Sequence, residues 1–569
     1  MSTPQDRPSS PKQDNIDIEK SVPTSLHSKT STMDATPRAE SFHSNDDMPK
    51  DQYLSGLKLI TVIVAVSLVC FLVLLDQSIL STATPLITTQ FHSLPDVGWY
   101  AGAFQLSSAA LQPLTGKLYT HFRIKYTFLI FLFVFEVGSL LCGVAQSSLM
   151  LIVGRAVAGL GSSGLMNGGL TIITVVAPLE KRPLFTGMAL GISQLGLVSG
   201  PLIGGALTEY TTWRWCFYIN LPLGALVAAA VLPLHIPDIN ILNEKFGYVL
   251  IRKTIPELDL PGFALFAPAS VMFLLALQFG SAHTYSWSSP TIIGLFVGAG
   301  ATGLIFIAWE YKQGARAMIP GFLLKQRFAY SSFIYSASLM SALATASYYL
   351  PIYFQAVTGA SPTMSGVYLL PSILSMMFLG VGSGALLSRT GYYLPWAAAG
   401  GVIMCIGNGL LSTFRPHTST GTWIGYQIIV GVGRGAGAQM AMVALQTLLP
   451  TKHIATGLAA MIFFNNFSTS IAIVLATTIF SETLKSNLNK YAPSIDIDAA
   501  LAAGGGAQAV RDLVPGGGPV LDGLLLSYSK SIGTVFYMCV GFAVLGFASS
   551  WGMGWGDRRR QLKATKNRR

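Results

Sequence analysis

Residues 57–81 read LKLITVIVAVSLVCFLVLLDQSILS, an apolar run that contains one lysine and one aspartate. A helix of about 20 apolar residues crosses the hydrocarbon core of a bilayer. Thirteen further runs of this kind follow, near residues 97–117, 126–145, 150–176, 184–207, 213–235, 260–280, 291–311, 330–352, 364–387, 393–413, 421–448, 455–480 and 531–553. The sequence therefore predicts an all-α integral membrane protein with fourteen transmembrane helices.

The composition of the whole chain fits a protein whose main partner is the lipid bilayer. The 569 residues are 51% hydrophobic and 11% charged, whereas a soluble domain carries about 25% charged residues. The net charge of +11 is spread over short loops and a terminal tail, which argues against a nucleic-acid partner. Five single cysteines form neither a metal-binding cluster nor a disulfide framework. We therefore expect no metal and no cofactor.

Lysine and arginine residues indicate how the chain crosses the bilayer. With the N-terminus inside, the short inner loops carry fourteen basic residues and the short outer loops two, Arg214 and Arg415. Basic residues favour the cytoplasmic side, and an even number of helices then places both termini there. We predict that residues 1–56 form a disordered cytoplasmic tail and that residues 554–569 form a basic cytoplasmic tail. Residues 481–530 contain two glycine clusters and are expected to form a flexible external loop.

Two short motifs recur along the chain at nearly equal spacing. RxxxGxG at residues 155–161 has a counterpart, QxxxGxG, at residues 427–433, and GxL at residues 116–118 has a counterpart at residues 384–386. Secondary transporters are often built from internal repeats. The repeat predicts equivalent six-helix bundles at residues 57–235 and 330–553. Residues 236–329 between them would hold a cytoplasmic loop and two inserted helices.

Charged side chains inside the predicted spans are the first functional candidates, because a charge is costly in the membrane interior. The protonation of a buried carboxylate depends on its neighbours, which is the property that a proton-coupling group needs. We therefore expect Asp76, Glu136 and Arg155 to carry proton coupling, with a structural pairing of the arginine and either acid as the alternative. Arg434 is expected to contact substrate or to stabilise a bundle. The spans show no nucleophile–base constellation and no GxxxxGK[ST] loop, so neither an enzyme nor an ATP-driven pump is expected.

A glycine-rich motif lies within the fifth predicted helix. Residues 196–205 read GLVSGPLIGG, where Gly196, Gly200, Pro201, Gly204 and Gly205 combine a close-packing face with a kink. This stretch resembles the antiporter motif of the major facilitator superfamily. Four further segments resemble the fourteen-helix drug:proton antiporters of that superfamily: LDQSILSTATP at 75–85, LIVGRAVAGLG at 151–161, WRWCFYINLPLG at 213–224 and GYQIIVGVGRGAG at 425–437. The loop GKLYTHF at 116–122 is similar to that of fungal toxin and multidrug efflux pumps.

The resemblance implies alternating access, with Asp76 at the family's acidic position and Arg155 at its proton-relay position. It also implies a gating loop that contains Gly116, Lys117, Arg123 and Lys125, in which Thr120 stands where the usual acid would be and Arg123 where the usual second glycine would be. The implied central cavity contains polar side chains, namely Gln105, Gln355, Gln427, Arg434 and Asn465. Tyr348, Tyr349 and Phe463 are candidates for stacking on a planar ligand, with ordinary packing as the alternative.

The function that follows from this resemblance is export of small organic toxins, secondary metabolites or drugs in exchange for protons. The expected cargo is a small amphipathic organic molecule, and we expect a monomer in the plasma membrane, or in a vacuolar or vesicular membrane. Proton-coupled uptake or exchange of a nutrient, amino acid or siderophore is the alternative. A non-transporting membrane sensor is the third possibility, and it would tolerate the loss of Asp76 and Arg155.

Overall fold

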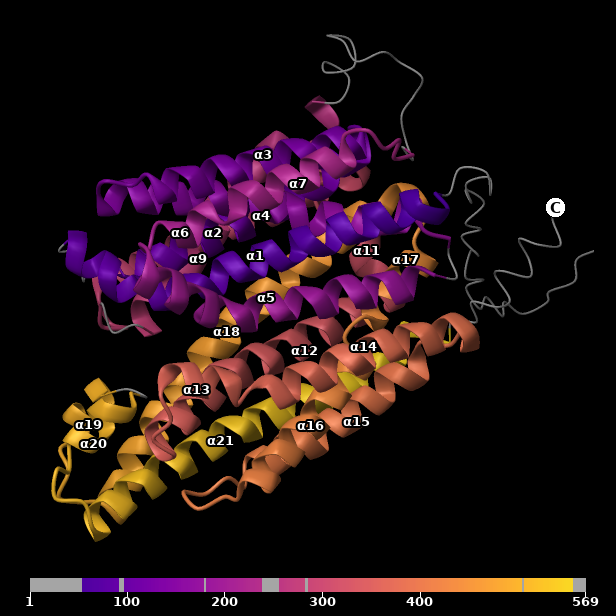
Figure 1. Cartoon of the computed structure of the whole chain (residues 1–569). Helices are drawn as coiled ribbons and strands as arrows, with labels where there is room; N and C mark the ends of the chain where they lie inside the picture. Colours follow the sequence, from indigo (N-terminus) through magenta and orange to yellow (C-terminus); the bar gives the residue numbers. More distant parts are fainter. Residues whose placement is uncertain are drawn as a thin grey trace, which may run out of the picture. The chain divides into compact units, whose positions relative to one another are not determined.

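A computed structural model describes residues 54–91, 97–178, 181–237, 255–281, 285–503 and 506–555. The regular structure in these segments consists of helices, without a strand (Figure 1). Almost all of the two predicted tails, and most of the loop that follows residue 237, lie outside the described residues. The prediction of an all-helical protein is confirmed for the described part of the chain.

Each of the first six predicted spans corresponds to a helix or to two consecutive helices. They are α1 (Gly56–Phe91), α2 (Val97–His121), α3 (Ile124–Gly143), α4 (Ser148–Val176), α5 (Arg182–Tyr210), and the pair α6 (Trp215–Tyr218) and α7 (Asn220–Val231). Local capping agrees with some of these limits, because the Ser147 hydroxyl accepts a hydrogen bond from the Met150 amide at the start of α4.

The remaining spans are likewise helical. They correspond to α9 (Leu260–Ser281), α10 (Pro290–Gln313), α12 (Arg327–Ile352), α13 (Pro362–Val367) with α14 (Leu370–Thr390), α15 (Leu394–Leu411), α16 (Thr420–Gly437) with α17 (Met440–Leu448), α18 (Thr451–Tyr491) and α21 (Pro519–Ser550). The short helices α11 (Gly321–Lys325), α19 (Ile497–Ala503) and α20 (Ala507–Asp512) join them. A π-helical turn, Tyr353–Val357, extends α12.

Among the described residues, ten helical segments are long and apolar enough to cross a membrane. Helix α5, with 29 residues, has the length but is not among the ten. Nor are α2, with 25 residues, and α12, with 26 residues. Serine, glutamine and tyrosine side chains lower the hydropathy of both helices. The count of fourteen spans therefore stays a prediction.

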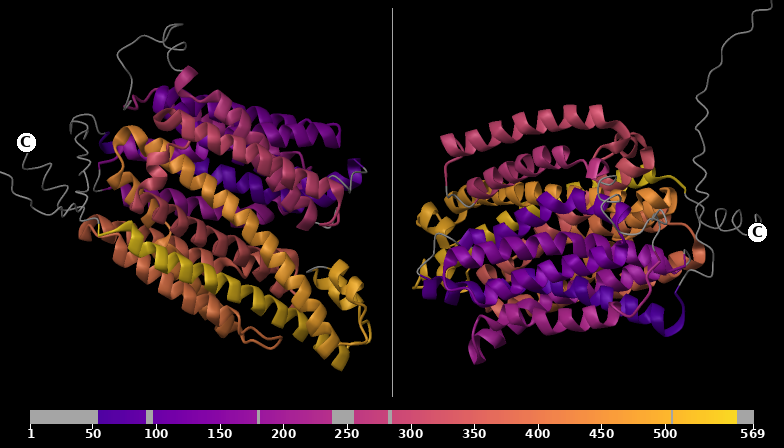
Figure 2. Two further views of the ribbon diagram at one scale, coloured as in Figure 1. Left: turned by 180° about the vertical axis from the view of Figure 1, so that it is seen from behind. Right: turned by 90° about the horizontal axis from the view of Figure 1, so that it is seen from above.

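The helices before residue 237 pack mainly on one another, and so do those after residue 326. In the first group α1 lies along α5, and α4 packs against α2 and α3; in the second, α16 packs against α14 and α15, while α12 packs against α18 and α21. The largest contacts between the groups are those of α5 with α14 and of α2 with α18 (Figures 1 and 2), and α18 also touches α4 while α13 touches α5. Helices α9 and α10 form a hairpin, and α9 touches α2 and α18. The domain limits and the inserted pair remain predictions.

The predicted repeat is visible in how glycines pack helix against helix. A side chain on Gly159 of α4 would overlap the Phe104 carbonyl and the Ser107 hydroxyl of α2. A side chain on Gly431 of α16 would overlap the same kinds of atom in α14: the Ser372 carbonyl and the Ser375 hydroxyl. The two glycines are counterparts in the RxxxGxG repeat. Phe104 and Ser107 of α2 are as far in sequence from Ser372 and Ser375 of α14 as the first GxL motif is from the second. The two helix pairs therefore have equivalent packing.

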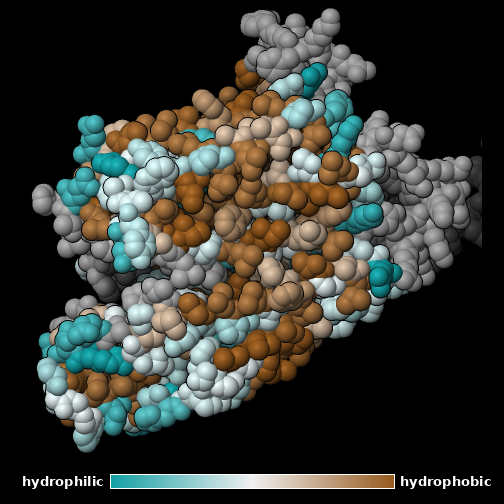
Figure 3. Space-filling view, viewed as in Figure 1, coloured by the Kyte–Doolittle hydropathy of each residue, from teal (hydrophilic) through white to brown (hydrophobic). Residues whose placement is uncertain are grey.

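The described surface carries large exposed apolar side chains along the helices. In Figure 3 apolar residues cover the middle of the face, and hydrophilic residues gather towards the two ends of the helices. Leu57 is 79% exposed, Phe133 68%, Leu304 70% and Phe378 70%. Contiguous exposed apolar surface of this kind is expected where a protein meets lipid.

The segment 481–530 differs from the predicted flexible loop. Helix α18 continues to Tyr491, α21 already begins at Pro519, and α19 and α20 lie between them. Leu484 and Leu488 on the extended part of α18 are buried, and Asn487 donates a hydrogen bond to Ser531 of α21 at 2.9 Å. Apolar burial and interhelical bonding therefore hold most of this segment in helices, while its glycine clusters mark the breaks between them.

Candidate functional site

The centre of the first helix group holds a buried ion pair between two predicted residues. The Arg155 guanidinium of α4 lies 2.5 Å from the Asp76 carboxylate of α1, and both side chains are at most 1% exposed. Arg155 Nε also donates to the Tyr100 carbonyl of α2 at 2.9 Å. The ring of Phe104 lies 4.5 Å from the guanidinium carbon. One arginine therefore connects α1, α2 and α4 through a charge pair, a carbonyl and a cation–π contact.

A third polar residue completes this pair. The Asn220 amide, at the start of α7, donates to the other oxygen of Asp76 at 3.0 Å and to the Ser139 hydroxyl of α3 at 3.1 Å. Asn220 is fully buried. The prediction from sequence omitted Asn220 and Ser139, although Asn220 lies within the quoted segment 213–224. An asparagine inside an apolar run is the signal that would have identified it.

Glu136 lies close to this network without joining it. Both of its carboxylate oxygens are buried and accept no hydrogen bond from a described residue. The Glu136 carboxylate fills the space that a side chain on Gly224 of α7 would occupy. Ser139 follows Glu136 by three positions on α3, so both residues share a helix face. Of the two acids that could pair with Arg155, the structure selects Asp76.

The glycine motif of α5 packs directly beside Asp76. A side chain on Gly196 would overlap the Phe71 carbonyl of α1, and one on Gly200 would overlap the Ser78 hydroxyl. Ser78 in turn donates to the Gly196 carbonyl at 3.1 Å. Gly205 faces open space, because no atom lies within 4 Å of a side-chain carbon placed there. Gly196 and Gly200 therefore fix the backbone of α1 on either side of Asp76, and Gly205 does not.

The other two motif residues have different surroundings. Pro201 lies within α5, and the structure describes nothing of its side chain. The Gly204 carbonyl accepts the Thr208 hydroxyl and, at 3.9 Å, the Cys216 thiol of α6. Gly204 therefore links the C-terminal half of α5 to the segment that precedes Asn220.

The predicted gating loop lies where the two helix groups meet. A side chain on Gly116 would approach the Ala459 side chain of α18 to 2.8 Å and the Thr456 backbone to 2.9 Å. The Thr120 hydroxyl lies 3.4 Å from that of Thr456. A neutral hydroxyl pair therefore stands where the family's usual acid would be. On the repeat-related side, a side chain on Gly384 of α14 would approach the Pro183 carbonyl of α5 to 2.6 Å.

The basic residues of this loop have separate partners. Lys117 donates to the Arg316 carbonyl, beyond α10, at 3.1 Å. Lys125 donates to the Leu232 and Leu234 carbonyls at 2.5 and 2.9 Å, and so caps the C-terminal end of α7. Arg123 is exposed and directly precedes α3. Lys117 therefore connects the loop to the segment that follows α10.

The residues expected to line a central cavity do not form one hydrogen-bonded group. Gln355 donates to Ser365 at 2.9 Å, and Gln105 is exposed on α2. Asn465 keeps a buried oxygen without a partner among the described residues. Gln427, the repeat counterpart of Arg155, donates to the Tyr368 carbonyl at 2.8 Å. Tyr368 corresponds to Tyr100 at the spacing of the GxL repeat, so this bond repeats the contact between Arg155 and Tyr100.

Arg434 of α16 is buried in the second helix group. It is 5% exposed, and its single hydrogen bond to a described residue, the Ala342 carbonyl of α12, is 3.5 Å long. Its Nε has no partner among the described residues. The Cys539 thiol of α21 shares the same carbonyl at 3.9 Å. Within the described chain, this guanidinium therefore lies buried without a carboxylate.

Comparisons with known proteins give a consistent answer over most of the chain. The family model described as Major Facilitator Superfamily matches residues 66–473. The chain is 53% identical to the MFS-type transporter calB of Penicillium decumbens, over 92% of each chain. It is 49% identical to the efflux pump mokI of Monascus pilosus, over 89% of this chain and 94% of mokI. It is 46% identical to the efflux pump mlcE of Penicillium citrinum, over 93% and 96%.

Solved structures with the same fold are more distant in sequence. The human organic anion transporter MFSD10 aligns with a TM-score of 0.55 at 11% identity, over 87% of this chain and all of that one. A double-tryptophan mutant of XylE aligns with a TM-score of 0.55 at 12% identity, over 89% of this chain and 98% of that one. At these identities the similarity establishes the fold.

Proposed function

Because the chain belongs to the Major Facilitator Superfamily, we propose that it is a proton-driven exporter of small organic toxins, secondary metabolites or drugs. The family and its relatives are membrane transporters, and the chain is therefore a transporter and not an enzyme. The names of two fungal relatives, both efflux pumps, support the outward direction. The observation that supports proton coupling is the buried ion pair of Asp76 and Arg155.

The proposed coupling step is a change in the charge of Asp76. When deprotonated, the carboxylate holds the Arg155 guanidinium at 2.5 Å and accepts the Asn220 amide. A proton on Asp76 removes the negative charge, so the attraction between α1 and α4 weakens in a region from which water is excluded. Glu136, one helical turn from Ser139, is the proposed second proton acceptor, since no described group satisfies it.

Alternating access requires contacts that form on one side and break on the other. Gly116 against α18 and Gly384 against α5 bring the two helix groups together at the end where α1 begins. We place this end in the cytoplasm, with both termini, and propose that these contacts open to admit cargo. A monomer in the plasma membrane, with the predicted bundles 57–235 and 330–553 as its two moving parts, is the simplest arrangement.

The proton gradient is sufficient for this task. One proton that crosses about 100 mV releases about 2.3 kcal/mol, and one pH unit adds about 1.4 kcal/mol. The total of about 3.7 kcal/mol supports a cargo gradient near 500-fold.

The test is accumulation of rhodamine 6G in pump-deficient yeast that expresses wild-type protein, Asp76→Asn or Glu482→Gln. Glu482 is an exposed carboxylate paired with Lys485, so Glu482→Gln is the matched control. We expect wild type and the control to lower accumulation, and Asp76→Asn and an uncoupler to abolish the effect. Higher accumulation with wild type, or full activity of Asp76→Asn, would contradict the proposal.

A further inference from the structure

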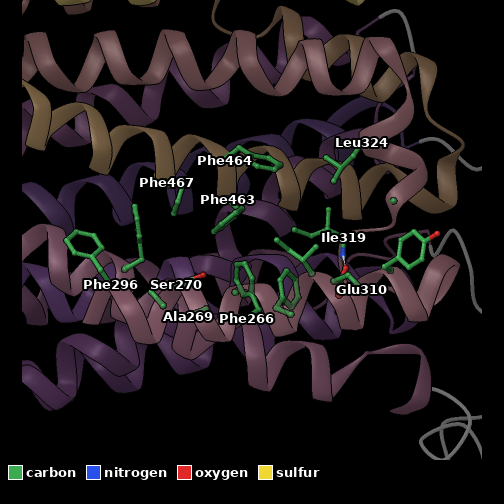
Figure 4. Close-up of a pocket in the computed structure, with 18 residues that line it drawn as sticks. Phe266, Ala269, Ser270, Phe296, Glu310, Ile319, Leu324, Phe463, Phe464 and Phe467 are labelled. Carbon is green, nitrogen blue, oxygen red and sulfur yellow. Dashed lines mark hydrogen bonds between the residues drawn. The ribbon is translucent and has the colours of Figure 1, made fainter. Parts of the chain in front are cut away.

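A cavity of about 680 Å³ lies between the α9–α10 hairpin, α11 and α18 (Figure 4). This volume lies within the roughly 300–1,000 Å³ of small-molecule sites. The cavity is separate from the Asp76 network, and no sequence motif indicated it. Its walls are formed by Phe266, Ala269, Ser270, Phe273, Phe296, Ala299, Gly300, Gly303, Phe306, Ile307, Glu310, Tyr311, Ile319, Gly321, Leu324, Phe463, Phe464 and Phe467.

Phenylalanine rings from both sides form most of the cavity wall. The rings of Phe266 on α9 and Phe463 on α18 meet edge to face, with centroids 4.9 Å apart. Those of Phe273 and Phe467 are stacked at the same distance. Phe463, expected to stack on a ligand between the bundles, faces this cavity instead (Figure 4). Rings presented by face and edge favour a flat, ring-containing ligand over a single acyl chain.

Two glycines of α10 create much of the space. No atom lies within 4 Å of a side-chain carbon placed on Gly300 or Gly303. The same wall is open to the surroundings, because Ile307 is 63% exposed and Tyr311 91%. The neighbouring Leu304, 70% exposed, faces outward on this apolar helix. The cavity is therefore open to the surroundings along α10, a helix that is long and apolar enough to cross a membrane.

One end of the cavity holds a carboxylate. Glu310 accepts the Met318 and Ile319 amides at 3.0 Å, which fixes its carboxylate beside Ile319 (Figure 4). Asp259 accepts the same Met318 amide at 3.2 Å, so a second carboxylate lies nearby. Ser270 contributes a hydroxyl to the wall. Lys117 of α2 interacts with both acids, and the Glu310 carboxylate in the cavity wall accepts hydrogen bonds and offers none to a phosphate. This end therefore suits a donor group and disfavours a phospholipid as the occupant.

We propose that this cavity binds the cargo before export, as a ring-containing apolar molecule with a hydroxyl or ammonium donor at one end, taken directly from the bilayer. This inference rests on the proposed function and adds an entry site and a substrate class to it. The rings of the ligand lie among the phenylalanines, and its donor points towards Glu310. The α9–α10 hairpin thereby acquires a role in the capture of cargo.

A labelling experiment tests occupancy directly. The Gly303→Cys variant, purified in nanodiscs, reacts with N-phenylmaleimide, and mass spectrometry follows the modification at that position. Rhodamine 6G, a ring-containing cation with amine donors, is the probe. At about ten times its dissociation constant it should slow the labelling about tenfold. Gly294→Cys is the matched control, since Gly294 also faces open space on α10 but lies outside the cavity.

Each outcome decides for or against the site. Protection at position 303 but not at 294 supports it. Equal labelling rates with and without rhodamine 6G overturn the proposal. Slower labelling at position 303 than at position 294 without added dye also overturns the proposal, because it means that nanodisc phospholipid occupies the cavity.

A second pair of variants connects the site to transport. Gly303→Trp fills the cavity and should abolish most of the rhodamine 6G efflux, whereas Gly294→Trp should leave it unchanged. Equal efflux by the two variants overturns the proposal. The Asp76→Asn substitution distinguishes this inference from the proposed function. Asp76→Asn should lose rhodamine 6G efflux, because proton coupling is lost. Rhodamine 6G should still protect the Gly303→Cys/Asp76→Asn variant from labelling, because the cavity is intact.

Discussion

The two helix groups bury an arginine in different surroundings. Arg155 of the first group pairs with Asp76 at 2.5 Å and donates to the Tyr100 carbonyl. Arg434 of the second group has one long contact, 3.5 Å from the Ala342 carbonyl, and lacks a carboxylate among the described residues. The two arginines do not occupy equivalent positions, because Gln427 is the repeat counterpart of Arg155 and Arg434 lies about two helical turns further along α16.

This contrast indicates which group can respond to protons. A carboxylate paired with an arginine can gain a proton and release its partner, so the first group contains a switchable charge. A guanidinium stays protonated under all physiological conditions, so Arg434 is a fixed charge. We infer that proton coupling belongs to the first group and that the second responds through the contacts between them.

The largest effect should come from breaking the pair. Arg155→Met leaves the buried Asp76 carboxylate without its cation, with the Asn220 amide as its remaining described donor, which should lower the free energy of unfolding by about 3–5 kcal/mol. Thermal unfolding of the purified protein, followed by fluorescence-detected gel filtration, measures the loss. The double variant Asp76→Asn/Arg155→Met should recover part of this stability but no transport. A single variant as stable as wild type would show that the pair contributes little.

An intermediate effect should follow from crowding the α1–α5 contact. Gly200→Val places a side chain against Ser78 of α1, and overpacking of this kind costs about 1–3 kcal/mol. Gly205→Val on the same helix points into open space and should be neutral. The two variants are compared by thermal unfolding and by rhodamine 6G efflux. Equal losses in both would mean that the motif acts through helix flexibility and not through close packing.

The smallest effect should be of opposite sign. Arg434→Met removes a buried charge that lacks a carboxylate and replaces it with a flexible apolar chain, which should raise the free energy of unfolding by about 1 kcal/mol. The same thermal assay applies. A loss as large as that of Arg155→Met would reveal that the contact with Ala342 is as strong as the ion pair, and the comparison between the groups would fail.

Much of the fold follows from the sequence because bilayer thickness sets the length of each apolar run. Asp76 and Arg155 were likewise identifiable as charges within such runs. Their pairing was not, since the rotation of α1 relative to α3 and α4 decides whether Asp76 or Glu136 meets Arg155. The helices within segment 481–530 depend on burial of Leu484 and Leu488, which local composition does not reveal.

The cavity beside α18 was hidden from sequence for a different reason. It depends on two absent side chains, at Gly300 and Gly303, and on how the hairpin is placed against α18. Glycines in an apolar helix usually indicate close packing, as they do at Gly159 and Gly431. Only the neighbouring helices distinguish a glycine that permits contact from one that leaves a space.

The glycine contacts that join α2 to α18 and α5 to α14 have a consequence for how the protein responds to its environment. Gly116, Thr120 and Gly384 meet backbone atoms, an alanine and a hydroxyl, and none of these groups carries a charge. Salt screens charged pairs over a Debye length of about 8 Å at physiological ionic strength, but it has little effect on neutral van der Waals contacts. The closure formed by these contacts should therefore depend little on salt concentration, and in the proposed mechanism the protonation of Asp76 and the binding of cargo are the signals that open it.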